Sequence, residues 1–188
     1  FYGVADLTNR EGLHTNAIYG FLNILFKILD EEEPSHLLVA FDEKAPTFRH
    51  KMYEEYKGKR KPMPAELSEQ VPVIRNLLQV MNIRIYAEEG IEADDILGTM
   101  AKKAEQEGYL VSIVSGDRDL LQLATDTILV RIPKTSRGKT VVEDYHTAQV
   151  IEKYSVTCYT INTVKNEKRG KKMKKIELLA PAGSFEKA

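Results

Sequence analysis

Short apolar runs that alternate with amphipathic segments limit the fold of this chain more than any other feature of its sequence. Residues 36–41 form a continuous apolar run, and both they and residues 110–114 have the pattern of buried strands. Shorter strands are predicted at 83–86 and 128–132, and helices at 15–30, 65–81, 92–107, 120–124 and 147–153. Because strands alternate with helices, the sequence predicts an α/β fold with a mostly parallel sheet that helices flank.

The composition excludes several classes of protein. A hydrophobic share of 43% is enough for a packed core, and the single cysteine excludes a disulfide scaffold and a multi-cysteine zinc site. No apolar run in the sequence reaches the length of about 18 residues that a transmembrane helix needs. A reducing, intracellular setting fits best. The chain opens at Phe1 without a methionine, so we expect it to be a fragment.

The charge is distributed unevenly although the formal net charge is only -1. Residues 43–62 hold seven Lys or Arg against three acids, and residues 165–175 hold seven against one, which leaves the remainder strongly acidic. A basic stretch beside an acidic body fits a polyanion that is held near carboxylate-bound metal. A solvated surface with clustered charge is the alternative interpretation.

Acidic residues follow the predicted strands, at the place where ligands bind in open α/β sheets. Six carboxylates share this position: Asp42 after the strand at 36–41, Glu92, Asp94 and Asp95 at the start of the helix at 92–107, and Asp117 and Asp119 after the strand at 110–114. So many acids at one edge would repel one another unless cations neutralise them. Clusters of oxygen ligands suit hard ions such as Mg²⁺ or Mn²⁺, and two such ions form the usual clamp for phosphodiester hydrolysis.

Each acidic group also has a structural alternative. The acids that open the helix at 92–107 are also explained as partners of the helix dipole, and the neighbours Asp94 and Asp95 point in different directions, so that only one of them ligates directly. Gly116 and Asp117 also fit a plain turn, and Asp42 also fits a helix cap or a turn.

The basic segment after residue 42 has the composition of a nucleic-acid contact. Phosphates would be contacted by Arg49, Lys51, Lys57, Lys59, Arg60 and Lys61, with Lys44 in the same stretch, and Tyr53 and Tyr56 would stack on bases of a single strand. A mobile, solvated loop is the alternative. Residues 43–64 show no clean period and are predicted to be a loop or partly helical.

Four phrases of the sequence occur in the order that one protein family uses: AFDEKAPTFRH at 40–50, YKGKRKPMP at 56–64, GIEADDILG at 90–98 and SGDRD at 115–119. Together with NAIYGF at 16–21, they resemble the 5′–3′ exonuclease domain at the start of bacterial DNA polymerase I. The second phrase is similar to the family's helical arch, and the last two are similar to its central acidic motifs. The resemblance covers residues 1–157.

The resemblance implies a resolvase-like (PIN-like) fold and a structure-specific 5′ nuclease that uses two divalent metal ions, Mg²⁺ or alternatively Mn²⁺. It assigns Asp42, Glu92, Asp94 and Asp95 to the first metal, Asp117 and Asp119 to the second, Asp42 also to catalysis, and Arg49, Lys57 and Arg60 to the scissile phosphate and the 5′ strand. The implied partners are DNA with 5′ flaps, nicks or free 5′ ends and a covalently attached polymerase domain. The implied location is the bacterial cytoplasm, in association with the nucleoid.

Parts of the family pattern are missing from this sequence. The family begins with a central strand that ends in an Asp-Gly-Asn-Ser phrase, and it continues to a Gly-Asp-x-Ser-Asp-Asn phrase and a helix–three-turn–helix. None of these is present here. We therefore expect a fold without its first strand and a nuclease with impaired activity. A non-catalytic DNA-binding relic and a non-functional truncated product are the alternatives.

Residues 158–188 depart from the family altogether. Residues 173–188 resemble the opening of a collagenase-like peptidase family, and residues 158–172 have no resemblance that we identify. We expect the whole tail to be disordered or a junction sequence that does not belong to the nuclease domain at 1–157. A genuine basic tail that helps to hold DNA is the alternative.

Overall fold

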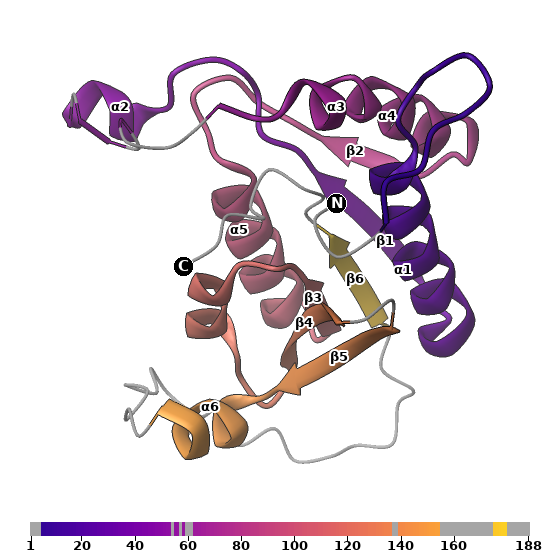
Figure 1. The fold of residues 1–188 in the computed structure, drawn as a ribbon. Helices are drawn as coiled ribbons and strands as arrows, with labels where there is room; N and C mark the ends of the chain where they lie inside the picture. The colour runs from indigo at the N-terminus through magenta and orange to yellow at the C-terminus, as the bar shows by residue number, and fades with distance from the viewer. Residues whose placement is uncertain are drawn as a thin grey trace.

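Six strands form one sheet in the order β2-β1-β6-β3-β4-β5 (Figure 1). The computed structural model describes residues 5–53, 55–56, 58, 62–136, 139–154 and 175–179. Its elements are α1 (Asn16–Glu32), β1 (His36–Ala40), α2 (Phe48–Met52), α3 (Ala65–Ser68), α4 (Gln70–Val80), β2 (Arg84–Tyr86), α5 (Ala93–Gln106), β3 (Leu110–Val114), the 3₁₀ helix η1 (Arg118–Leu123), β4 (Ile128–Ser136), β5 (Lys139–Tyr145), α6 (Thr147–Tyr154) and β6 (Lys175–Leu179). Among these described helices, none is long and apolar enough to cross a membrane.

The sheet is parallel except at one edge, which confirms the predicted α/β fold. β1 pairs in parallel with β2 and β6, and β3 pairs in parallel with β6 and β4. β5, which we did not predict as a strand, pairs antiparallel with β4 as the second arm of a hairpin. The carboxyl ends of the parallel strands therefore lie at one edge of the sheet, as a site there requires.

Helices cover both faces of the sheet, because successive side chains of each strand point to opposite faces. On one face Ala40, Ile113 and Leu178 pack against Leu97 and Ala101 of α5. On the other face Val39, Val114 and Leu179 pack with residues of α1 and α4, such as Leu25 and Leu78. Figure 1 shows α5 and α1 on opposite sides of the central strands.

β6 lies in the centre of the sheet, although its residues belong to the tail at 158–188 that we expected to be disordered or a junction sequence. It pairs with β1 from His36–Ile176 to Val39–Leu179 and with β3 from Leu110–Lys175 to Val114–Leu179. Its side chains explain this position, since Leu178 and Leu179 are buried on opposite faces. The expectation of disorder is therefore wrong for 175–179, while 158–174 and 180–188 lie outside the described residues.

The helix predicted at 65–81 is divided in two. α3 ends at Ser68, and α4 begins at Gln70. Pro72 gives the physical reason, because a proline ring clashes with the carbonyl group four residues earlier, which here is that of Ser68. The predicted segment at 43–64 is partly helical, as expected, with α2 in its middle.

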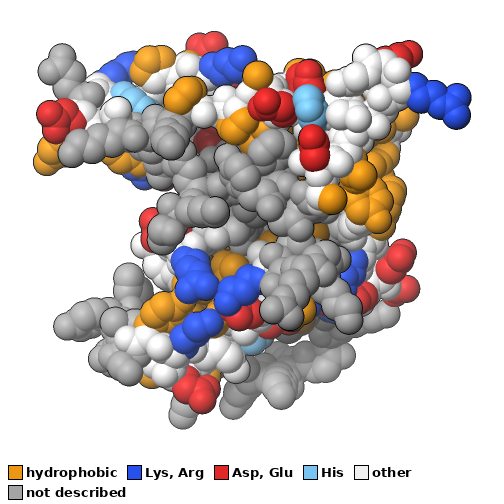
Figure 2. Space-filling model, in the orientation of Figure 1, with side chains coloured by type: hydrophobic (Ala, Val, Ile, Leu, Met, Phe, Trp, Pro, Cys, Tyr) orange, Lys and Arg blue, Asp and Glu red, His pale blue; other side chains and the backbone are white. Residues whose placement is uncertain are grey.

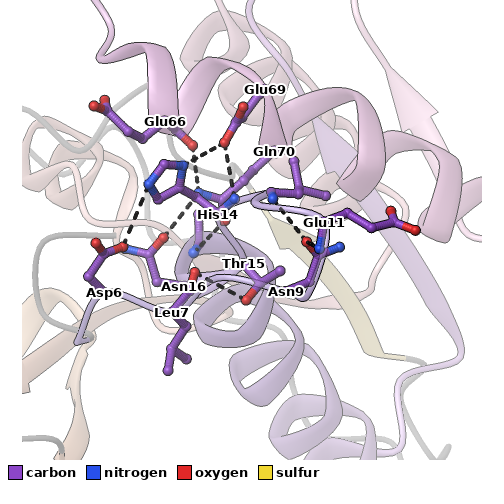
Figure 3. A network of polar contacts seen from close by, with 12 residues as sticks. Asp6, Leu7, Asn9, Glu11, His14, Thr15, Asn16, Glu66, Glu69 and Gln70 are labelled. Atoms are coloured by element: carbon purple, nitrogen blue, oxygen red, sulfur yellow. Dashed lines mark hydrogen bonds and ion pairs between the residues drawn. The ribbon is translucent and has the colours of Figure 1, made fainter.

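A buried network joins the start of α1 to the α3–α4 junction (Figure 3). Gln70 is fully buried, and its Oε1 accepts hydrogen bonds from the backbone N–H groups of Ala17 (2.8 Å) and Ile18 (3.2 Å). Its Nε2 donates to Asn16 Oδ1 at 3.0 Å. These bonds satisfy N–H groups at the helix start, which have no partner within the helix. Beside them, His14 Nδ1 lies 2.7 Å from Glu69 Oε1 and fixes the preceding loop.

Candidate active site

The predicted acidic residues gather at the carboxyl edge of the sheet in two groups. Asp42 lies two residues beyond β1, and Glu92, Asp94 and Asp95 lie at the start of α5. Asp117 and Asp119 lie just beyond β3. We call the first four residues the α5 acids and the last two the β3 acids.

Asp42 connects the end of β1 to the start of α5. Its Oδ1 accepts a hydrogen bond of 2.7 Å from the backbone N–H of Ala93, the first residue of the helix. The carboxylate thus lies at the positive end of the helix dipole. The helix-cap role, which the sequence left open beside metal binding, is therefore one role that Asp42 has in the fold.

Arg49 of α2 binds the acids of α5 directly. Its guanidinium group makes a two-pronged contact with Asp95, with Nη1–Oδ2 at 2.6 Å and Nη2–Oδ1 at 2.7 Å, and Nη1 also lies 3.2 Å from Glu92 Oε2. Bidentate contacts of this kind, with two parallel N–H···O hydrogen bonds, are among the stronger ion pairs. The hydrogen bonding of Arg49 to the carboxylate of Asp95 is the main cause that raises the pKa of Arg49. The arginine that we expected at the scissile phosphate therefore neutralises two predicted metal ligands.

Tyr56 reaches the same group of acids from the segment after α2. Its hydroxyl donates to Glu92 Oε2 at 3.2 Å, and its ring lies edge-on to the ring of His50, with centroids 5.2 Å apart. The carboxylate of Glu92 is buried, so these contacts hold it in one place. Tyr56, predicted to stack on a base, is thus part of the acidic site in this structure.

The β3 acids are held by local contacts. The backbone N–H of Asp117 donates to Ser115 Oγ at 3.1 Å, and Asp117 Oδ1 accepts from the backbone N–H of Asp119 at 2.8 Å. Asp117 thereby caps η1, which agrees with the turn interpretation. Asp119 is exposed to solvent.

β6 separates the two groups of acids. β1 and β3 are its two neighbours, so the strands that carry Asp42 and Asp117 lie about 10 Å apart, two strand spacings of about 4.8 Å. Within the described parts of the chain, no three His, Cys, Asp or Glu side chains form a group that could hold a metal ion. Carboxylate oxygens are nevertheless the donors that a hard divalent cation prefers. The assignment of six carboxylates to two metals remains a prediction.

Four of the predicted DNA-binding residues, Lys57, Lys59, Arg60 and Lys61, lie outside the described residues. Lys44 and Lys51 are exposed, and Tyr53 is 71% exposed, as a surface that contacts DNA requires. Phe48, also exposed, lies under the guanidinium group of Arg49 at 4.5 Å. Figure 2 shows the face of the molecule hollowed on its left side, with Lys and Arg side chains gathered beneath the hollow.

Two residues that the sequence did not single out, Arg75 and Ser115, support the site. Arg75 of α4 donates from Nη1 to Glu43 Oε1 at 2.9 Å and lies 4.6 Å above the ring of Phe41, so it braces the segment that holds Asp42. Ser115 is buried and orients Asp117. The phrase SGDRD included Ser115, but no spacing in the sequence links Arg75 to residues 41–43, because the contact is made across two elements.

Comparisons with known proteins identify the family of this chain. Residues 1–155 match the family described as 5′-3′ exonuclease, N-terminal resolvase-like domain. The chain is 52% identical over 157 residues to DNA polymerase I of Bacillus caldotenax. This alignment covers 84% of this chain and 18% of that protein. It is 43% identical over 152 residues to DNA polymerase I of Mycobacterium leprae, over 81% of this chain and 16% of that protein. The chain thus spans less than a fifth of the length of these relatives.

Solved structures show the same fold. A T5 5′-exonuclease with divalent metal ions (zinc) bound aligns with a TM-score of 0.59 and 20% identity, over 73% of this chain and 52% of that one. A T5 flap endonuclease in a complex with DNA and metal ions aligns with a TM-score of 0.58 and 19% identity, over 73% of this chain and 52% of that one. The sequence match over most of its length shows that this chain belongs to the family of 5′-3′ exonuclease, N-terminal resolvase-like domains.

Proposed function

We propose that this chain is the resolvase-like part of a structure-specific 5′ nuclease that hydrolyses phosphodiester bonds in DNA at 5′ flaps, nicks and free 5′ ends. The single observation that carries the proposal is the pair of acidic groups at the carboxyl ends of β1 and β3. They lie on either side of one central strand, beside a basic and aromatic segment. In the relatives this domain is part of DNA polymerase I, so the whole protein would act in bacterial DNA replication and repair, in the cytoplasm near the nucleoid.

The two acidic groups would hold two divalent cations, Mg²⁺ or Mn²⁺. Asp42, Glu92, Asp94 and Asp95 would serve one ion, directly or through water, and Asp117 and Asp119 the other. Bound ions would supply a hydroxide nucleophile at neutral pH and stabilise the charge that develops on the phosphate.

The residues of the chain itself would position the substrate. Arg49 is held against Asp95 and Glu92, so a phosphate that approaches the acids meets a guanidinium group already at the site. Two N–H groups in a fork suit two phosphate oxygens as well as they suit a carboxylate. Lys57 and Arg60 would guide the 5′ strand, and exposed Tyr53 would stack on a base.

The activity of this chain is expected to be low. The strand between those that lead to Asp42 and Asp117 is β6, and its last residues, Leu178 and Leu179, offer no carboxylate at this edge. A metal site that lacks one of its ligands binds its ion more weakly and positions it less well. A DNA-binding relic without cleavage is therefore the second candidate function.

Cleavage of a labelled 5′-flap duplex in Mg²⁺ or Mn²⁺ tests the proposal, with Asp117→Ala as the matched control. Metal-dependent release of the flap that the control lacks would support a working nuclease. Failure of the folded wild-type chain to cleave would reject catalysis for this chain.

Binding of the same flap distinguishes the second candidate from a product without function. The relic predicts that the wild-type chain binds the flap and that Lys57→Ala and Arg60→Ala weaken binding while the circular dichroism spectrum is unchanged. Equal binding by wild-type and variant chains would reject a specific DNA contact through this segment.

A further inference from the structure

The central strand of the sheet comes from a segment far away in the sequence. β6 enters between β1 and β3, and 20 residues, 155–174, separate it from the end of α6. Its backbone pairs in parallel with both neighbours over four or five residues. β1 and β3 thus form a slot that takes an extended peptide by backbone hydrogen bonds on both sides, a known mode of peptide recognition.

Most of the side chains of β6 fit this slot. Leu178 is fully buried against the α5 face, and Leu179 is buried against the α1 face. The start of the strand is fixed by Ser35, whose backbone N–H and Oγ both donate to the carbonyl oxygen of Lys175 at 3.0 and 2.6 Å. Lys175 Nζ lies 3.3 Å from Glu32 Oε2. The slot therefore selects an extended segment with apolar side chains that point to both faces.

Glu177, in the middle of the strand, does not fit. It is 1% exposed, and its Oε2 has no hydrogen-bond partner among the described residues. Its neighbours in the sheet are Leu37 on β1 and Ser112 on β3, and neither carries a charge. A buried carboxylate without a close cation is costly, whereas a neutral residue there would not be.

The charged groups around Glu177 do not remove this cost. Burial is the main cause that raises the pKa of Glu177 to about 7. The nearby hydroxyl of Ser112 on β3 lowers it, whereas the carboxylate of Glu32 on α1 raises it further. Arg131 of β4 and Lys175 of β6 lower it, but Arg131 is itself paired with Glu32 and Asp144. Because the pKa in the sheet lies above the ordinary value of 4.5, ionisation of Glu177 favours release of the strand, and the effect grows between about pH 4.5 and pH 7.

We propose that the space between β1 and β3 is a strand-binding slot in which residues 175–179 are an exchangeable occupant. An extended apolar segment that is neutral at its centre then binds there in trans as a parallel strand. The partner class is thus a peptide or chain terminus with branched or leucine side chains facing both ways. The affinity for such a segment is set by competition with the tethered strand.

A fluorescein-labelled peptide of residues 173–182 that carries Glu177→Leu is the probe. The full chain is refolded from urea in the presence of the peptide, so that slow release of β6 does not limit the exchange, and polarisation is measured at pH 6 and pH 8. We expect saturable binding that is about tenfold tighter at pH 8, because ionised Glu177 weakens the competing strand by that factor. A peptide that also carries Leu178→Pro, which removes a backbone donor, should not bind.

The full chain with Glu177→Leu is the matched protein control. Its own strand has no carboxylate, so it should bind the probe more weakly than wild type at pH 8 and without dependence on pH. Glu177→Gln is the second variant if the first does not fold. The proposal is overturned if no saturable binding follows refolding, if the proline peptide binds equally well, or if the variant chain binds the probe as wild type does.

Discussion

The two groups of acids at the sheet edge are held in different ways. Among the α5 acids, the contacts join residues that are 51, 46 and 43 positions apart, as between Asp42 and Ala93 or Arg49 and Asp95. The β3 acids are held by contacts over two residues only, and Asp119 is exposed. The carboxylates of the α5 acids therefore stabilise contacts between distant parts of the chain, whereas those of the β3 acids make only local contacts.

This difference predicts which substitutions lower both stability and activity and which lower activity alone. Removal of Asp42, Glu92 or Asp95 breaks contacts between elements, so folding and activity should be lost together. Removal of a β3 acid changes little in the fold, so a loss of activity there would report on chemistry alone.

The variants Asp117→Asn and Asp119→Asn should separate chemistry from folding most clearly. We expect each to lower the rate of Mn²⁺-dependent flap cleavage by at least about a hundredfold. Each removes an anionic ligand of the proposed cation that stabilises the charge developing on the phosphate. The thermal midpoint should stay close to that of wild type, since an asparagine at 117 retains the side-chain oxygen that caps η1 and Asp119 is exposed. Single-turnover cleavage and thermal melting measure the two quantities, and equal losses in both would contradict the comparison.

Arg49→Ala should show the structural weight of the α5 acids. The substitution leaves Asp95 and the buried Glu92 without the guanidinium group, and we expect the free energy of unfolding to fall by about 1–3 kcal/mol. Added Mn²⁺ should restore part of the loss, because a cation beside the two carboxylates would replace the charge of the guanidinium group. Urea unfolding with and without Mn²⁺ is the measurement.

Arg49→Lys is the control for that experiment. It keeps the positive charge but not the two-pronged geometry, so an intermediate loss is expected. A lysine variant as unstable as the alanine variant, with no response to Mn²⁺, would mean that packing on Phe48 and not charge is what Arg49 contributes.

Asp42→Ala should cost less stability than Arg49→Ala. It removes the cap on the first N–H of α5, a change worth about 1 kcal/mol at helix starts. Asp42→Asn keeps an oxygen acceptor and should restore most of that stability without restoring cleavage. A thermal midpoint for the asparagine variant as low as that of alanine would show that the charge and not the hydrogen bond stabilises the helix.

The His14–Glu69 pair, which lies in neither group, should give the smallest effect and a distinct pH dependence. The hydrogen bond that the His14 ring donates to Glu69 raises the pKa of His14, and the same contact lowers the pKa of Glu69. The histidine contribution is complete below about pH 6.5 and is lost as the pH rises through the raised pKa. The carboxylate contribution is present above about pH 4.5 and is lost on acidification.

The difference in thermal midpoint between wild type and His14→Gln should therefore be largest between about pH 5 and pH 6.5. It should disappear at alkaline pH. Glu69→Gln is the matched control and should show the same window, and a difference that persists at pH 9 would point to packing instead of charge.

The sequence predicted the parts of the fold that depend on local pattern. The strands at 36–41 and 110–114 and the helices at 15–30 and 92–107 are confirmed, because apolar side chains recur there with the period of each structure. The gathering of Asp42 and Asp117 at one edge also followed from the sequence, since parallel strands place their carboxyl ends together.

Features that depend on distant partners did not follow from the sequence. Residues 175–179 are apolar enough for a strand, but only the pairing with β1 and β3 makes them one. In the same way, the contacts of Arg49 with Asp95 and of Gln70 with Ala17 join residues with no periodic relation. The break at Glu69, where α3 ends and α4 begins, was not predicted although its cause is local, since Pro72 cannot continue the turn that precedes it.

The position of β6 has a consequence for biosynthesis. Ser35 and Lys175 are in contact although they are 140 residues apart, so β1 is made long before its central neighbour. During translation the strands β2-β1 and β3-β4-β5 are available while the slot between them is still open, and unpaired strand edges attract other strands. The chain is therefore expected to depend most on chaperones while it is still on the ribosome, until residues 175–179 emerge.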